Sequence, residues 1–285
     1  MRKFEEMKQI IGNMKSTNYA VPAGVDLDDL MADMLRFVGT TDSDLREGIY
    51  STFVTWCEET KDFSPEQVRH ILNTSMDNEH LFLGVGESGT DSVFMRAFSS
   101  LLVCVALYVH YEQPFLAEAE IQTVKAAVLQ YVHQEKDYRG YVEGKGWAHA
   151  IAHAADALAH ILCIEKATDV PGDYSIGREG TLELLEAAKM LAINSELVYN
   201  AEEDERLAVA VIDAFESNAL SKDDMCNWLT ELSEEIERKV MPTDYYRRIN
   251  QKHFMRSVYF KLMANEDLRY LGEFLFKIMM KEEED

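Results

Sequence analysis

Glycine and proline are scarce in this sequence, which has 14 glycines and 5 prolines among 285 residues. Both residue types interrupt regular helices and mark turns, so their scarcity leaves room for long uninterrupted helices. Apolar residues recur at helical spacing through most of the chain, as the series Phe4, Met7, Ile11 and Met14 illustrates. Composition and periodicity together predict an all-α protein of about twelve helices.

Cysteines are few and widely spaced. Cys57, Cys104, Cys163 and Cys226 lie far apart, and no two of them form a C-x-x-C pair. This distribution disfavours a disulfide framework or a zinc ribbon and is typical of reduced cysteines that pack inside a cytoplasmic protein.

Long apolar runs are also missing. The most apolar segment, residues 97–109, is shorter than the roughly 20 residues that a membrane-spanning helix needs. The first sixteen residues contain Glu5 and Glu6 and have no apolar signal core. We therefore expect a cytoplasmic protein with no membrane partner, in which residues 97–109 form a helix that is buried on all sides.

Basic residues are outnumbered, with 28 Lys and Arg against 51 Asp and Glu and a formal net charge of −23. A surface of this sign repels a phosphate backbone, so we expect no nucleic-acid partner. An acidic surface commonly serves solubility. The functional interpretation of the excess acid is a cationic partner or a metal ion.

Short loops join most of the expected helices in pairs. This pattern predicts a right-handed α-solenoid of HEAT-like helical hairpins, with a compact helical bundle as the alternative. The run Asp-Ser-Asp-Leu-Arg at residues 42–46 is similar to HEAT repeats, in which Asp and Arg tie successive hairpins together. We expect one helical-repeat domain over residues 1–285, with a subdomain break near 169–175, where Val-Pro-Gly-Asp interrupts the helical pattern.

Ionisable residues concentrate in the segment 135–163, which holds three of the eight histidines within twelve residues. We expect the helical part of this segment to begin near Gly146. At about 100° per residue, one arc of roughly 80° then carries His149, His153, Asp156, His160 and Cys163. The opposite face of the expected helix is apolar and would bury Trp147, Ile151, Leu158 and Ile161.

The pattern His-x-x-x-His-x-x-Asp suggests two kinds of chemistry. Imidazoles and a carboxylate are ordinary ligands for zinc, iron or manganese, so His149, His153 and Asp156 are metal candidates. Further ligands would have to come from Asp91, Asp137, Glu143 or His160. The residue after His149 is Ala150 rather than the Glu of a zinc protease, so that class is disfavoured.

In an acid–base enzyme the same residues would have different roles. His149 or His153 would be the general base, because imidazole ordinarily titrates near neutral pH. Asp156 would orient the base, and Arg139 would stabilise developing negative charge.

A structural interpretation competes with both. His149 and His153 would donate hydrogen bonds to Asp91 or Asp137, and Arg96 and Arg139 would pair with Asp156 or Asp137. A satisfied buried network of this kind fixes one packing arrangement of neighbouring helices. The candidate ligand pocket or polar pin therefore comprises Asp91, Arg96, Asp137, Arg139, Trp147, His149, His153, Asp156 and His160.

Two sequence motifs carry a resemblance to a known family. They are the run Thr-Asp-Ser-Val-Phe-Met-Arg-Ala-Phe-Ser at 90–99 and the segment 139–156, with Arg-Gly-Tyr followed by Gly-Trp-Ala-His-Ala-Ile-Ala-His-Ala-Ala-Asp. The chain resembles the uncharacterised bacterial domain-of-unknown-function family 2785 from about Leu27 to Met263. The resemblance implies a helical, HEAT-like fold and implies no activity.

These observations lead to two functional hypotheses. The first is a non-catalytic binding or scaffold module that uses a concave face to bind an unknown protein or small molecule. The alternative is a metal-dependent or acid–base hydrolase-like enzyme centred on His149, His153 and Asp156. No cofactor is specified by the sequence beyond the divalent metal of this alternative.

Overall fold

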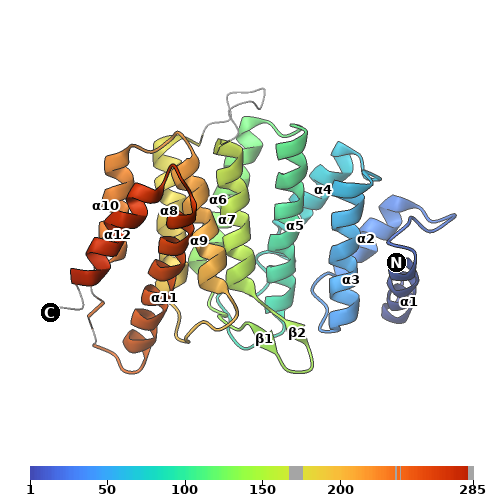
Figure 1. Ribbon diagram of the computed structural model, residues 1–285. Coiled ribbons are helices and arrows are strands. Elements are labelled where there is room, and N and C mark those ends of the chain that lie inside the picture. The colour runs from blue at the N-terminus through green and yellow to red at the C-terminus, as the bar shows by residue number, and fades with distance from the viewer. Residues whose placement is uncertain (167–175, 235, 238, 282–285) are drawn as a thin grey trace. The chain divides into compact units, whose positions relative to one another are not determined.

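The computed structural model describes residues 1–166, 176–234, 236–237 and 239–281 (Figure 1). Within these residues it contains twelve α-helices, one short π-helix and a two-stranded antiparallel sheet. The prediction of an all-α protein with about twelve helices is thus confirmed. The chain divides into two compact units, Met1–Ala157 and Leu158–Asp285, and the boundary falls inside helix α7. The break predicted near 169–175 lies outside the described residues.

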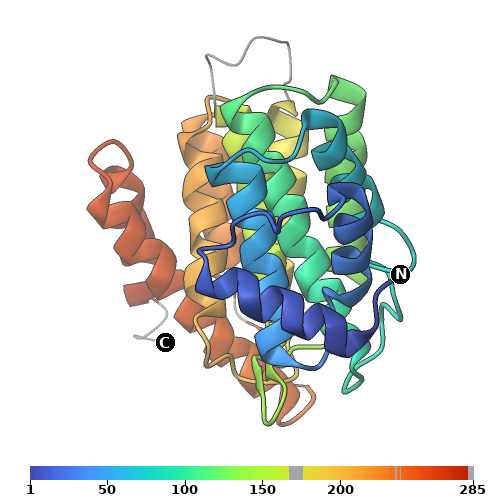
Figure 2. The ribbon, with the colours of Figure 1, turned by 90° about the vertical axis from the view of Figure 1, so that its right-hand side faces the viewer.

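The first unit is built around helices α3 and α5. Contacts join α3 to α1, α2 and α5, and α4 packs against both α2 and α5. Figure 2 shows α1 lying across α3. The elements of this unit are α1 (Phe4–Ser16), α2 (Leu27–Phe37), α3 (Ser43–Val54), the π-helix η1 (Thr55–Glu59), α4 (Pro65–Ser75), α5 (Ser92–Glu112), α6 (Glu118–Gln134), β1 (Tyr141–Val142), β2 (Gly146–Trp147) and the first half of α7 (Ala150–Lys166).

Side-chain caps define where several of these helices begin. Asp26 accepts a hydrogen bond from the amide of Asp29 at 3.1 Å, and Asp42 accepts one from the amide of Leu45 at 2.9 Å. Ser64 and Gln67 form the reciprocal capping box that their spacing predicts. Each cap satisfies a first-turn amide that has no partner within the helix.

Helix α5 is the core helix of the first unit. Every residue from Ala97 to Leu107 is buried, whereas Tyr108 and Tyr111 near its end are exposed. The helix spans 21 residues and is long and apolar enough to cross a membrane by these two criteria alone. However, 78% of its most apolar window is buried inside the protein, as in the core helix of a folded domain.

The second unit contains the remaining helices, with α11 in contact with α8, α9 and α12. Its helices are α8 (Gly177–Ile193), α9 (Glu203–Glu216), α10 (Lys222–Leu232), α11 (Thr243–Ala264) and α12 (Arg269–Lys281). Two neutral amides on α11 secure the loops of this unit. Asn250 accepts from the amide of Tyr199 at 3.0 Å and donates to the carbonyl of Leu197 at 2.8 Å. Gln251 donates to the carbonyls of Leu232 and Glu234 at 2.7 and 2.8 Å.

Candidate functional site

A β-hairpin occupies the place where the sequence predicts the start of a helix. Tyr141 pairs with Trp147 and Val142 pairs with Gly146, whereas α7 begins only at Ala150. The prediction of a helix from Gly146 is therefore wrong. The physical reason is a pair of glycines with positive φ, Gly144 at +75° and Gly146 at +79°, which favour a tight turn over a helix.

The hairpin docks on α3 through the side chain of Arg46, which is fully buried. Its guanidinium donates to the carbonyls of Lys145 at 2.7 Å and Trp147 at 3.2 Å, and also to the carbonyl of Thr40 at 2.7 Å. Its central carbon lies 4.4 Å from the ring centre of Phe94. Arg46 thus holds the hairpin backbone while its guanidinium lies over the ring of Phe94. We call Arg46, with the hairpin carbonyls of Lys145 and Trp147 that it binds, the clamp.

The setting of Arg46 is electrostatically expensive. Burial lowers the pKa of its guanidinium, and the negative charges of Glu47 and Asp42 offset only part of that effect. Glu47 is the nearest carboxylate and lies 3.9 Å away. The Nε atom of Arg46 has no hydrogen-bond partner among the residues that the structure describes. Because the buried cation is held mainly by carbonyl groups of the hairpin and of Thr40, displacing the hairpin would leave it without most of its hydrogen bonds.

Gly146 lies against the first residues of α3. A Cβ atom at this position would lie 2.9 Å from the Cβ of Ser43 and 3.1 Å from Nη2 of Arg46. The position also requires a positive φ, so both space and backbone conformation favour glycine. The glycine thus permits the contact on which the clamp depends.

A second buried arginine, Arg96 on α5, ties two loops together. It forms a two-pronged ion pair with Glu135, with Nε–Oε2 at 2.7 Å and Nη2–Oε1 at 2.9 Å, and both side chains are fully buried. It also donates to the carbonyl of Leu83 at 3.0 Å and to the hydroxyl of Ser92 at 2.8 Å. Burial lowers the pKa of Arg96, but the hydrogen bonds and charge of Glu135 outweigh it and leave that pKa raised.

Asp137, which is fully buried, forms a second ion pair in this region. It pairs with Arg139 at 2.6 Å, which is one of the two pairings that the sequence predicts for this arginine. Asp137 also accepts from the amide of Gly89 at 2.9 Å, and Arg139 donates to the carbonyl of Thr90 at 2.7 Å. The hydrogen bonds and charge of Asp137 raise the pKa of Arg139. Arg96 and Arg139 thus join the loop before α5 to the loop after α6.

His153 lies inside the first unit and is 7% exposed. Its Nδ1 is 3.2 Å from the carbonyl oxygen of Ala97, so this nitrogen carries the proton when the ring is neutral. Its own carbonyl accepts from the hydroxyl of Ser100 at 3.1 Å, and its ring meets that of Phe98 edge-on at 5.5 Å. These contacts pack α7 against α5.

His149 lies outside the helix, with a φ of +53°, and its carbonyl accepts from the amide of His153 at 3.0 Å. Its ring stacks on that of Trp147 at 4.4 Å, and the ring of Tyr141 meets Trp147 edge-on at 5.2 Å. Trp147 is 42% exposed and Tyr141 is 62% exposed. The expectation that Trp147 is buried is therefore wrong, because the residue belongs to the hairpin rather than to an apolar helix face.

The remaining predicted site residues are Asp91, Asp156 and His160. Asp91 pairs with Lys145 of the hairpin at 2.6 Å, so this carboxylate contacts an ammonium group. Asp156 is half-buried on α7, and His160 is a half-buried residue of the second unit. Over the described ranges, no three His, Cys, Asp or Glu side chains gather closely enough to hold a metal ion.

Arg46 and Glu135 organise this region and are not among the predicted site residues. Arg46 belongs to a HEAT-like run, and its partners in the hairpin lie about a hundred positions later in the chain, at a separation of 99 for Lys145. The signal that could have located the hairpin is the pair of glycines at 144 and 146 on either side of a lysine.

Comparison with known proteins gives one match. No curated protein and no solved structure matches the chain. The family model described as "Protein of unknown function (DUF2785)" matches residues 81–260, a range that includes Arg96, Glu135 and the whole hairpin. Since the match covers more than half of the sequence, the chain belongs to this family.

Proposed function

We propose that the protein is a non-catalytic binding module and that the hairpin of residues 141–147, with His149, forms its contact surface. The observation that carries this proposal is the exposure of Tyr141 and Trp147 on a backbone held in place by a buried arginine. Tyrosine and tryptophan contribute most to binding energy when they are presented in a rigid arrangement, because little conformational entropy is then lost on binding.

The partner that fits this surface is a protein with exposed basic side chains. The chain has a net charge of −23, which attracts a basic surface and repels a phosphate backbone. Indole and phenol faces also bind guanidinium and ammonium groups directly. The absence of a nucleic-acid or membrane partner and a cytoplasmic location are parts of the same proposal.

The HEAT-like architecture belongs to this proposal as well. Neighbouring helices are in contact in each unit, such as α1 with α2 in the first and α8 with α9 in the second. In a right-handed solenoid, such pairs would stack with a constant rotation and form the concave binding face expected of helical repeats. A crystal structure tests this arrangement, and a closed bundle of the same helices would contradict it.

The hydrolase alternative has less support. Its proposed base, His153, is almost fully buried with Nδ1 directed at a backbone carbonyl, and its second histidine is stacked on Trp147. A divalent metal bound by His149, His153 and Asp156 stays a prediction, to be checked by elemental analysis of protein purified without chelator.

Photo-crosslinking tests the binding proposal. We would replace Tyr141 with p-benzoylphenylalanine and use the same replacement of Phe260, a 67% exposed residue of the second unit, as the matched control. A basic protein that crosslinks at position 141 only is then purified and titrated. We expect Trp147→Ala to weaken its binding by at least about tenfold. Equal crosslinking at both positions, or equal affinity of wild type and Trp147→Ala, would contradict the proposal.

A further inference from the structure

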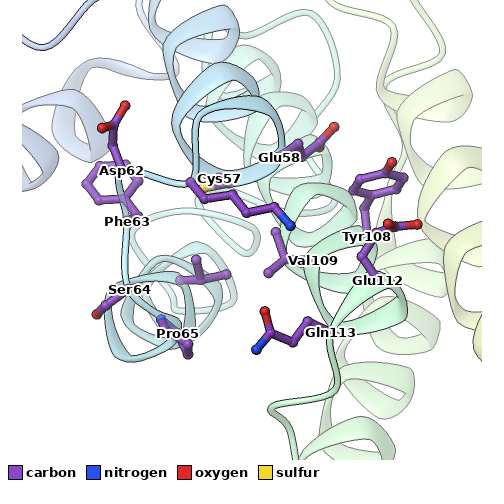
Figure 3. A pocket seen from close by; sticks show the side chains of 12 residues that line it. Cys57, Glu58, Asp62, Phe63, Ser64, Pro65, Tyr108, Val109, Glu112 and Gln113 are labelled. Atoms are coloured by element: carbon purple, nitrogen blue, oxygen red, sulfur yellow. The ribbon is translucent and has the colours of Figure 1, made fainter.

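A cavity of about 400 Å³ lies in the first unit, away from the hairpin. Its wall comes from three segments, namely η1 with the turn that follows it, the first turns of α4, and the end of α5. Figure 3 shows Phe63 and Pro65 on one side and Tyr108, Val109 and Glu112 on the other. A cavity of this size is within the range of small-molecule sites.

The backbone around this cavity is irregular in two places. Residues Thr55–Glu59 form a π-helix, a rare element that often occurs at functional sites, and they place Cys57 and Glu58 in the wall. Lys61, also in the wall, has a φ of +58°, a left-handed conformation that is unfavourable for a residue with a side chain. Both irregularities lie in one wall of one cavity, which points to a shaped site rather than to a packing defect.

Glu58 is the polar group that distinguishes the cavity. It is half-buried, and no hydrogen bond or ion pair engages its carboxylate within the part of the chain that the structure describes. Burial, with the nearby charge of Glu59, raises the pKa of Glu58 to about 7. An unpaired carboxylate in such a setting gains most from a ligand that brings a positive charge.

Carboxylates outnumber ammonium groups in the wall, where Glu58, Asp62 and Glu112 are present with Lys61. Glu112 comes from the last turn of α5, where the helix end carries partial negative charge. Phe63, Val68 and Val109 supply apolar surface, and Tyr108 supplies an aromatic ring. Burial raises the pKa of the Cys57 thiol to about 12, so this sulfur stays protonated and is not a nucleophile.

We propose that this cavity is a binding site for a small organic ammonium compound with an apolar body. The ammonium group binds the Glu58 carboxylate, and the apolar body lies against Phe63, Val68 and Val109. This site is separate from the hairpin surface, and either proposal can fail without the other.

Three probes of equal size test the charge that the cavity selects: hexylammonium, 1-hexanol and hexanoate. Binding to the whole protein is followed by NMR chemical-shift changes at residues of the cavity wall. At about pH 8 we expect hexylammonium to bind at least about tenfold more tightly than hexanoate, because Glu58 is then ionised. Equal or tighter binding of hexanoate would overturn the proposal.

Two variants locate the charge. Glu58→Gln keeps the shape of the side chain and should weaken hexylammonium binding by about tenfold while leaving 1-hexanol binding unchanged. Glu66→Gln, an exposed carboxylate on α4 outside the cavity wall, is the matched control and should change neither. Equal hexylammonium affinities for wild type and Glu58→Gln would contradict the assignment.

The affinity for hexylammonium should also fall as the pH is lowered from about 8 to about 6, since Glu58 gains a proton across that interval. The other charged or titratable groups around it are Cys57, Glu59, Lys61, Asp62, Tyr108 and Glu112. Retention of the same pH dependence in Glu58→Gln would overturn the role given to Glu58.

Discussion

The two units hold their loops against helices with different kinds of side chain, namely charged arginines in the first unit and neutral amides in the second. In the first unit, Arg46 and Arg96 hold loop and hairpin backbone, with Glu135 as the buried counter-charge. In the second unit, Asn250 and Gln251 serve the same purpose with neutral amides. A buried charge that loses a partner is left uncompensated, whereas a buried amide that loses a partner forfeits only a hydrogen bond. We therefore expect the loss of one hydrogen-bond or ion-pair partner to lower the free energy of unfolding more in the first unit than in the second.

Removing the counter-charge of Arg96 should have the largest effect. Glu135→Gln keeps the shape of the side chain but leaves a fully buried guanidinium unpaired. We expect the free energy of unfolding to fall by about 3–5 kcal/mol in urea titration. The double variant Arg96→Met/Glu135→Leu removes both charges and should recover part of this loss. A loss below about 1 kcal/mol in the single variant would break the comparison between the units.

Replacing Arg46 of the clamp should have the next largest effect on the free energy of unfolding. Arg46→Lys keeps a positive charge but lacks the planar group that reaches three carbonyls. We expect a loss of about 2–3 kcal/mol and faster hydrogen exchange at the hairpin amides. Unchanged exchange at residues 141–147 would show that the hairpin does not depend on the clamp.

Removing a neutral anchor of the second unit should cost less. Asn250→Ala leaves the amide of Tyr199 and the carbonyl of Leu197 without their partner, and we expect a loss of about 1–2 kcal/mol. The value is measured under the same conditions as that of Glu135→Gln. A loss larger than that of Glu135→Gln would reverse the ranking of the two units.

Trp147→Ala should change stability little. The ring is 42% exposed and stacks mainly on His149, so we expect a loss under about 1 kcal/mol. A loss of about 3 kcal/mol or more would indicate that the ring is buried in the folded protein.

Glu58 tests the cost of an unpaired charge in the first unit, because its half-buried carboxylate has no partner in the described residues. Its pKa of about 7 in the folded protein lies above that of an unfolded chain. A carboxyl with a raised pKa favours the folded state at low pH, and this contribution is lost as the pH rises through about 7. Glu58→Gln should therefore raise the melting temperature by roughly 1–2 °C at about pH 8 and by a smaller amount at about pH 5.

Much of the fold is readable from the sequence because helices depend on local spacing. Asp26 and the pair Ser64 and Gln67 are of residue types that favour helix starts, and they cap their helices in the structure. The hairpin is not readable in this way, since Trp147 and Ile151 are four residues apart and resemble one helix face. The partners of Arg46 lie in a distant part of the chain, and no local pattern identifies them.

Acrylamide quenching of tryptophan fluorescence tests most directly whether the clamped hairpin presents Trp147 to solvent. Trp56 and Trp228 are 0% and 4% exposed, so Trp147 should account for nearly all of the quenchable emission. We predict that Trp147→Phe removes most of the quenching seen in the wild-type protein. An unchanged quenching constant in that variant would contradict the account.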